Sequence, residues 1–187
     1  MSVKLLFFAG SSRKESLNKK LARAACDLAT DAGATATFID LRDYPMPLYD
    51  GDWEDENGLP ETTIDLKKIF TDHDGFLIAS PEHNSAYSSL LKNTLDWISR
   101  SHYEKEPALS AYQNKVAAII AASPGGLGGL RGLVPLRMLL GNIAVTVVPN
   151  QMALPHAHKA FDKDGKLKDE ANVSALSRVV DKLIDVA

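Results

Sequence analysis

The segment 10–18 holds the first set of residues that could do chemistry. It reads Gly-Ser-Ser-Arg-Lys-Glu-Ser-Leu-Asn, and it lies between a short apolar run and a helical pattern. Hydroxyls, free backbone N–H groups, a guanidinium and a helix N-terminus each favour a bound phosphate. A polar loop that ends in a Ser cap is the alternative, because Ser-rich turns are common before helices. The position directly after an apolar run favours the phosphate site.

Two further segments have unusual chemistry. Residues 80–87 read Ser-Pro-Glu-His-Asn-Ser-Ala-Tyr, and such a turn can offer backbone groups to the edge of a planar ring, with His83 against its face. Residues 123–131 contain four glycines in five positions, which lets the backbone approach a ligand closely. An ordinary surface loop and a mobile lid are the respective alternatives. Three such loops at strand ends together indicate a ligand site.

An alternation of strands and helices must position these loops. Short apolar runs predict strands at 3–9, 35–41, 76–79, 116–122 and 144–148, and helical periodicity predicts helices at 17–32, 62–72, 88–101, 130–140 and 170–186. Helix-length connections between strands imply a parallel sheet covered on both faces. Residues 42–60, rich in Pro and Gly, are interpreted as a surface loop. We therefore predict a doubly wound α/β fold in one domain, residues 1–187, with its ligand beyond the carboxyl ends of the strands.

Composition argues against several classes of partner without excluding them. The chain has 187 residues and a net charge of −3, so no extended positive field attracts nucleic acid or an anionic membrane. Cys26 is the single cysteine, which rules out an internal disulfide and fits the cytoplasm. The apolar run near the N-terminus is too short to span a bilayer. We expect a cytoplasmic protein that binds neither nucleic acid nor membranes.

Several familiar cofactor- and metal-binding motifs are incomplete or absent in this sequence. Gly126 and Gly128 are spaced for a dinucleotide fingerprint, but Arg131 stands where its third glycine belongs, and no phosphate-binding P-loop exists. His156 and His158 have no Cys or suitably spaced acidic residue beside them, so they are interpreted as solvated loop histidines and no metal site is expected. The small-residue surroundings of Cys26 favour packing over nucleophilic chemistry.

Taken together, the three loops resemble those of the NADPH-dependent FMN reductase family, which includes quinone, azo-dye and chromate reductases. The matching segments are GSSRKESLNKKLA, YPMPLYDGD, SPEHNSAYSSLLKNTLDWISR, SPGGLGGLRGLVPLRMLL and FDKDGKL. The resemblance implies a flavodoxin-like fold with strand order 2-1-3-4-5 and FMN at the switch point of the sheet. It also implies NADPH or NADH as co-substrate and a homodimer or homotetramer, with the helix 88–101 and the segment after it near the interface. Trp97 and Tyr103 supply apolar area there, and a place in the core is the equal alternative for either side chain.

The resemblance also assigns roles to individual residues. It implies that the FMN phosphate is held by Ser11, Arg13, Ser16 and Asn18. It implies that the isoalloxazine is bordered by Pro81, Glu82, His83 and Asn84, and flanked by Ser123, Gly125 and Gly126. The family usually has Tyr at the position of His83, where an imidazole still offers a flat face. No catalytic side chain is assigned, because a flavin carries its own redox chemistry.

Two classes of function compete at this point. The first is an FMN-dependent NAD(P)H oxidoreductase that reduces quinones, azo compounds, chromate or free flavin by a ping-pong mechanism. The second is a flavodoxin-type electron carrier or a flavin redox sensor that acts through protein partners. Carriers are strongly acidic and have a hydroxyl-rich phosphate loop, whereas this chain has a charge of −3 and Arg13 in that loop. The sequence therefore favours the enzyme.

Overall fold

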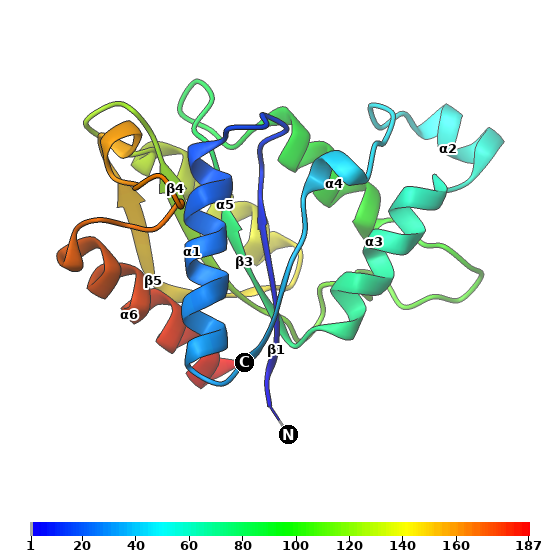
Figure 1. The fold of residues 1–187 in the computed structure, drawn as a ribbon. Coiled ribbons are helices and arrows are strands. Elements are labelled where there is room, and N and C mark those ends of the chain that lie inside the picture. The colour runs from blue at the N-terminus through cyan, green and yellow to red at the C-terminus, as the bar shows by residue number, and fades with distance from the viewer. Residues whose placement is uncertain (1) are drawn as a thin grey trace.

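A sheet of five parallel strands forms the centre of the computed structural model, which describes residues 2–187 (Figure 1). In chain order the strands are β1 (Lys4–Ala9), β2 (Thr35–Phe38), β3 (Gly75–Ala79), β4 (Val116–Ala122) and β5 (Thr146–Leu154). Across the sheet they lie in the order β2-β1-β3-β4-β5, and every pair is parallel. The predicted flavodoxin-like, doubly wound topology is thus confirmed.

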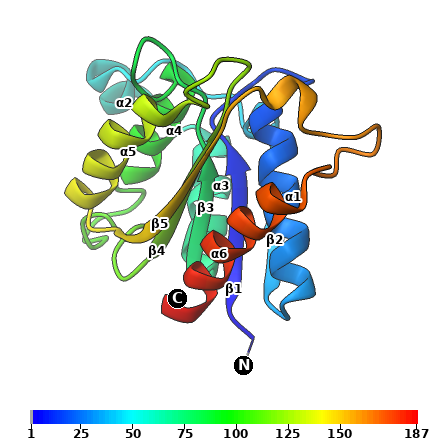
Figure 2. The ribbon, with the colours of Figure 1, turned by 90° about the vertical axis from the view of Figure 1, so that its left-hand side faces the viewer.

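Helices cover both faces of the sheet (Figure 2). On one face lie α1 (Leu17–Asp31) and α6 (Glu170–Val186), and on the other lie α3 (Glu61–Asp72), α4 (Ser89–Ser99) and α5 (Leu130–Asn142). Two short 3₁₀ turns, at Leu41–Asp43 and Ala157–Lys159, complete the regular elements apart from α2, described below. Within residues 2–187, no helix is both long and apolar enough to cross a membrane.

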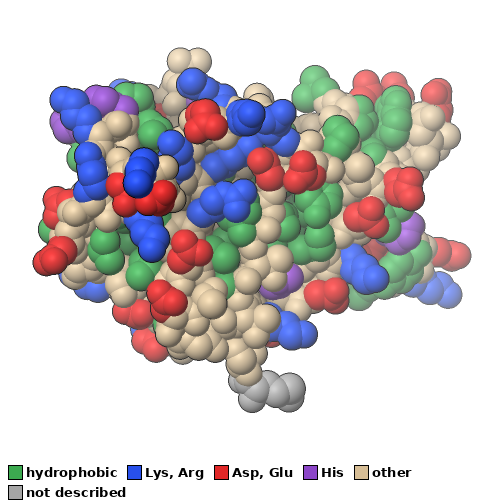
Figure 3. All heavy atoms as spheres, viewed as in Figure 1, with side chains coloured by type: hydrophobic (Ala, Val, Ile, Leu, Met, Phe, Trp, Pro, Cys, Tyr) green, Lys and Arg blue, Asp and Glu red, His purple; other side chains and the backbone are tan. Residues whose placement is uncertain are grey.

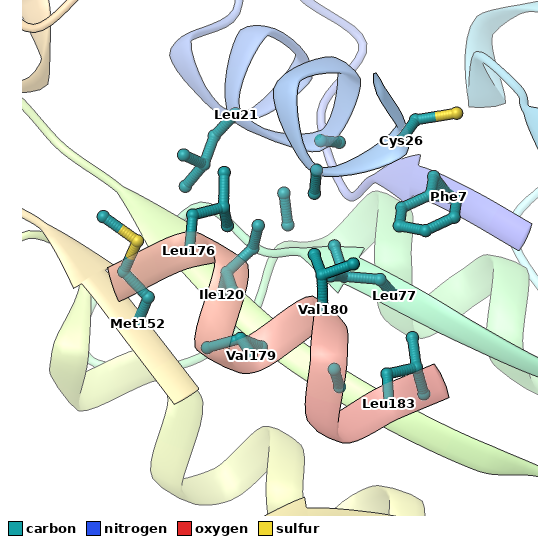
Figure 4. Packing of buried hydrophobic residues seen from close by; sticks show 14 of the residues in the cluster. Phe7, Leu21, Cys26, Leu77, Ile120, Met152, Leu176, Val179, Val180 and Leu183 are labelled. Atoms are coloured by element: carbon teal, nitrogen blue, oxygen red, sulfur yellow. The ribbon is translucent and has the colours of Figure 1, made fainter. Parts of the chain in front are cut away.

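The strands are apolar on both faces because each face is buried under helices. Along β1, Leu5 and Phe7 point into the cluster beneath α1 and α6, whereas Leu6 and Phe8 point into the cluster beneath α3, α4 and α5. Figure 4 shows the first cluster, in which Leu176 of α6 lies close to Leu21 of α1 and to strand residues. This double burial holds the carboxyl ends of the strands in place.

The interpretation of residues 42–60 as a loop is wrong in part, because they contain the short helix α2 (Gly51–Asn57). Asp50 caps it by accepting hydrogen bonds from the backbone N–H groups of Asp52 and Trp53. Gly58 ends it with a φ of 73°, which favours glycine. Pro and Gly are so frequent around this helix that the sequence pattern favoured a loop, although the two capping residues flank a helix-length segment.

The surroundings of α2 decide between the two alternatives for Trp97 in favour of the core. This side chain is fully buried, its indole Nε1 donates to the carbonyl of Pro47 at 2.8 Å, and Trp53 packs edge-on against it with ring centroids 5.6 Å apart. Trp97 therefore attaches the 42–60 segment to α4 and offers nothing to a partner. Tyr103, by contrast, is exposed.

The fifth strand is longer than predicted and begins later: it runs over Thr146–Leu154 instead of 144–148. The ladder with β4 shifts register between Ala117 and Ile119, whose partners are Val147 and Gln151. Pro149 lies in this irregularity on an edge strand, where its missing N–H costs no ladder hydrogen bond. The loop at the ligand edge consequently follows Leu154, not the predicted strand end.

Candidate functional site

The order of the strands creates a switch point between β1 and β3. The chain leaves β1 toward α1 on one face of the sheet and leaves β3 toward α4 on the other face, so the two loops diverge at the carboxyl edge. The glycine-rich loop follows β4, the next strand along. All three segments that stood out in the sequence therefore meet at one edge of the sheet.

The loop after β1 presents donors and positive charge. Ser16 caps α1 by accepting from the backbone N–H of Lys19 at 3.4 Å, and the first turn of α1 has no acidic residue. Arg13 is exposed and, within residues 2–187, its guanidinium makes no hydrogen bond or ion pair. Figure 3 shows Lys and Arg side chains gathered over this end of α1. The loop is thus suited to an anionic group.

Asn18 is placed differently from the rest of this loop. It is buried, its side-chain Nδ2 donates to the carbonyl of Ala122 at 2.9 Å, and its Oδ1 accepts from the N–H of Ala122 at 2.9 Å. These two bonds attach the start of α1 to the end of β4. Only one amide N–H of Asn18 is left for a ligand, so its contacts within the chain position the loop.

The loop after β3 is a tight turn attached to the first loop. The backbones of His83 and Ala86 exchange two hydrogen bonds of 2.8 and 3.0 Å, with Asn84 and Ser85 between them at φ values of 52° and 68°. This is a two-residue turn with left-handed backbone at both central positions, which Asn tolerates well. Ser88 donates its hydroxyl to the carbonyl of Gly10 at 2.5 Å. His83 and Asn84 are consequently exposed beside the first loop.

An ion pair attaches the second loop to the third. The Arg131 Nε donates to Glu82 Oε1 at 2.8 Å, and the Arg131 backbone N–H donates to Glu82 Oε2 at 3.2 Å. The Glu82 side chain is mostly buried, whereas Arg131 is exposed. Both carboxylate oxygens are thus used within the chain. The sequence did not identify Arg131 as a site residue, because its partner Glu82 lies 49 positions away in the chain and the pairing has no local signal.

Two glycines of the glycine-rich loop have left-handed backbone conformations, and a third faces space that no atom of the chain fills. Gly128 and Gly129 have φ values of 62° and 91°, and a Cβ on Gly128 would lie 2.7 Å from the carbonyl carbon of Leu154. A Cβ on Gly126 would meet nothing within 4 Å. Around this open position lies a depression of about 410 Å³, which is lined by Glu82, Asn84, Ser123, Gly125, Gly126, Leu127, Gly128, Gly129 and Arg131.

The predicted site residues divide between this depression and the phosphate loop. Glu82, Asn84, Ser123, Gly125 and Gly126 line the depression, whereas Ser11, Arg13 and Ser16 belong to the loop before α1. Pro81 and His83 are not among its lining residues, although their loop borders it. A planar ring beside small glycines and an anionic group at the helix start fit these two parts, so the residues present suit FMN.

A larger hollow of about 630 Å³ lies alongside α1 and is not assigned as the site. Its lining includes three positively charged residues and three negatively charged ones, namely Lys20, Arg23, Lys166, Asp27, Asp31 and Asp164. The hollow therefore has no net charge that would favour an anionic ligand. It contains no residue of the three loops, and doubly wound folds bind ligands at the carboxyl ends of their strands.

The fold and these loops define a flavodoxin-like α/β protein with its site at the β1/β3 switch point. Within that class, the family described as NADPH-dependent FMN reductase matches residues 3–159. The chain belongs to this family, and it is an FMN-dependent NAD(P)H oxidoreductase.

Individual relatives agree with the family. A 2-hydroxy-1,4-benzoquinone reductase from Burkholderia sp is 31% identical over 183 residues, which cover 97% of this chain and 94% of the relative. An NADPH azoreductase from Bacillus sp. is 28% identical over 169 residues, covering 90% of this chain and 84% of the relative. Among solved structures, the flavoenzyme NAD(P)H:(acceptor) oxidoreductase FerB from Paracoccus denitrificans has a TM-score of 0.80 at 27% identity, covering 98% of this chain and 96% of its own.

Proposed function

We propose that the chain binds FMN across the three loops and reduces small acceptors such as quinones and azo compounds with NAD(P)H. The observation that carries this proposal is the open depression beside Gly126, adjacent to a loop in which the Arg13 guanidinium makes no hydrogen bond or ion pair within residues 2–187. The relatives named as quinone reductase and azoreductase support the acceptor classes.

When bound, FMN supplies the redox chemistry, by taking a hydride from NAD(P)H and passing two electrons to an acceptor. The residues of the chain bind and orient it. We assign the phosphate to Ser11, Arg13 and the start of α1, with Asn18 holding that loop against β4. Glu82 and Arg131 fix the spacing between the second and third loops. No side chain of the depression needs to act as a general base.

The proposed function predicts ping-pong kinetics. The depression is open to solvent, and we expect NAD(P)H and the acceptor to use it in turn. Initial rates of NAD(P)H oxidation, measured at several fixed concentrations of a quinone, an azo dye or free FMN, should give parallel double-reciprocal lines. If the FMN-loaded protein left NAD(P)H unoxidised with every acceptor, the electron carrier would replace the reductase.

We expect Arg13→Ala to weaken FMN binding by roughly 10- to 150-fold, because a hydrogen bond to a charged group contributes about 1.5 to 3 kcal/mol. Riboflavin, which lacks the phosphate, should bind worse than FMN to the unmodified protein and equally to both proteins. Titration of flavin fluorescence measures all four affinities.

The matched control is Lys163→Ala, which removes the same charge from an exposed turn that belongs to none of the three loops. It should leave the FMN affinity unchanged. Equal binding of FMN and riboflavin by the unmodified protein would show that the loop before α1 does not hold the phosphate.

Three broader features belong to the same proposal. We propose a single FMN-binding domain over residues 1–187, supported by one sheet whose two faces carry both apolar clusters. We propose a cytoplasmic location, supported by the lone, buried and unpaired Cys26. We propose a homo-oligomer, although Trp97 has no part in its interface.

A further inference from the structure

Charge is distributed unevenly along the carboxyl edge of the sheet. Residues 107–161 supply β4, α5, β5 and the start of the loop after β5, and they contain no Asp or Glu, although the chain has 24 such residues. At the opposite end of the edge, the α2 segment is acidic, with Asp50, Asp52, Glu54, Asp55 and Glu56. In Figure 3, Asp and Glu gather at the upper right, whereas His, Lys and Arg gather at the upper left, over the end of β5. This field favours an anionic group on the β5 side.

The turn directly after β5 presents three hydrogen-bond donors to solvent. The side chains of His156, His158 and Lys159 are exposed, whereas Ala157 between them is fully buried and anchors the turn in the core. Within residues 2–187, none of the three exposed side chains makes a hydrogen bond or an ion pair. Lysine carries three N–H donors, and an imidazole carries at least one in either protonation state. The turn is therefore suited to an anion with several oxygens.

Backbone hydrogen bonds attach this turn to the glycine-rich loop. The N–H of His156 donates to the carbonyl of Gly125 at 3.3 Å, and the N–H of Ala157 donates to the carbonyl of Ser123 at 3.0 Å. Ser123 and Gly125 both line the depression of the candidate site, whereas no residue of the turn does. The turn therefore lies beside the depression and leaves it open for the reacting ring of a substrate.

The other basic residues in the loops at this edge have different roles. Arg131 is held by its ion pair with the carboxylate of the second loop. Arg13 and Lys14 belong to the loop that we assign to the FMN phosphate. Arg42, after β2, adjoins the acidic residue Asp43. The turn after β5 is consequently the basic group that remains for a second phosphate.

We propose that His156, His158 and Lys159 bind the 2′-phosphate of NADPH and so select NADPH over NADH, an inference that rests on the proposed function. The nicotinamide would use the depression, and the adenosine half would lie over the turn.

The chemistry of the 2′-phosphate matches this donor set. A phosphate monoester carries nearly two negative charges and three terminal oxygens, and the turn offers three donor side chains. Each phosphate of the pyrophosphate carries a single charge, and NADH contains that group as well. Sites that prefer NADH place a carboxylate on the ribose 2′-hydroxyl. Residues 107–161 contain no carboxylate side chain that could do so or that would repel a 2′-phosphate.

Isothermal calorimetry of the FMN-loaded protein with NADP⁺ and with NAD⁺ tests the site without turnover. The unmodified protein should bind NADP⁺ at least roughly 10-fold more tightly than NAD⁺, because hydrogen bonds to a charged group are strong. Lys159→Ala should remove most of this difference, and His158→Ala part of it. Equal affinities of the unmodified protein for the two nucleotides would overturn the proposal.

Lys68→Ala is the matched control. Lys68 is exposed on α3, which covers the opposite face of the sheet from the cluster that contains Ala157. This variant loses the same charge and should keep the full difference between NADP⁺ and NAD⁺. Lys159→Ala should melt as the unmodified protein does, because the Lys159 side chain makes no contact of this kind within residues 2–187. A loss of the difference in Lys68→Ala as large as in Lys159→Ala would contradict the assignment to this turn.

Steady-state rates separate this inference from the proposed function. In Lys159→Ala the ratio of kcat/KM for NADPH to kcat/KM for NADH should fall roughly 10-fold. An equal loss for both nucleotides would place the turn on the shared pyrophosphate and overturn the assignment to the 2′-phosphate. If the unmodified protein oxidised NADH and NADPH equally well, the reductase would stand and only this inference would be wrong. If the FMN-loaded protein oxidised neither nucleotide, the proposed function would fail and this inference with it.

Discussion

Gly126→Val is expected to lower the affinity for FMN at least roughly 100-fold while the protein stays folded. A side chain at this position would enter the depression, because the Cβ direction meets no atom of the chain within 4 Å. Overfilling a packed site costs about 1–3 kcal/mol or more, which is the range of a 100-fold change in affinity. The backbone φ of Gly126 lies outside the left-handed region, so the substitution adds no strain of its own.

Gly128→Val is the contrasting variant in the same loop. Its Cβ would lie within 2.8 Å of the backbone of Ala153 and Leu154, and its φ of 62° disfavours a branched residue. We expect it to destabilise the fold, whereas Gly126→Val should melt as the unmodified protein does. Isothermal calorimetry with FMN and thermal denaturation separate the two effects. Unchanged FMN affinity in Gly126→Val would mean that the glycine loop is a turn or a lid and does not border the flavin.

Lys67→Met is expected to reduce the free energy of unfolding by about 3 kcal/mol, near the lower end of the range for breaking a buried ion pair. Lys67 Nζ lies 2.7 Å from Glu106 Oε1, and the two side chains are 8% and 5% exposed. The Lys67 ammonium also donates to the carbonyl of Arg100. Its loss leaves Glu106 buried with only the Ser110 hydroxyl and the His102 N–H, both at 2.5 Å.

Two controls accompany this measurement by urea denaturation. Lys92→Met breaks the exposed pair with Asp96 on α4 and should change stability by less than about 0.5 kcal/mol. Lys67→Met combined with Glu106→Leu should recover much of the loss, because no buried charge then remains unpaired. If the single variant were as stable as Lys92→Met, the buried pair would contribute nothing to the fold.

The same pair predicts a dependence of stability on pH. Burial pushes the pKa of Glu106 up, but hydrogen bonds from Lys67, Ser110 and His102 outweigh it and hold the pKa below its ordinary value of 4.5. A carboxyl whose pKa is lower in the folded state stabilises the fold above its unfolded pKa, and that contribution is lost as the pH falls through the folded pKa. The unmodified protein should therefore lose stability below about pH 4.5, and the double variant should lose less.

The sequence by itself determined the kinds of element and the loops between them. Buried parallel strands are continuous apolar runs, and helix ends depend on local residues such as Ser16 before α1 and Ser88 before α4. Both features are visible within a few residues. The three chemistry-bearing loops could therefore be placed at the carboxyl ends of β1, β3 and β4, and they do meet at one edge. The strand order came from the resemblance, because periodicity carries no information about neighbours.

Only the tertiary structure decided what depends on residues far apart in the chain. The amide of Asn18 is engaged by Ala122, 104 positions away, and Glu82 by Arg131, 49 positions away, so neither pairing has a local signal. Pro149 could stay in β5 because the strand lies at the edge of the sheet. Trp97 is buried while Val134 is exposed, since burial depends on which elements pack over a helix face and not on how apolar that face is.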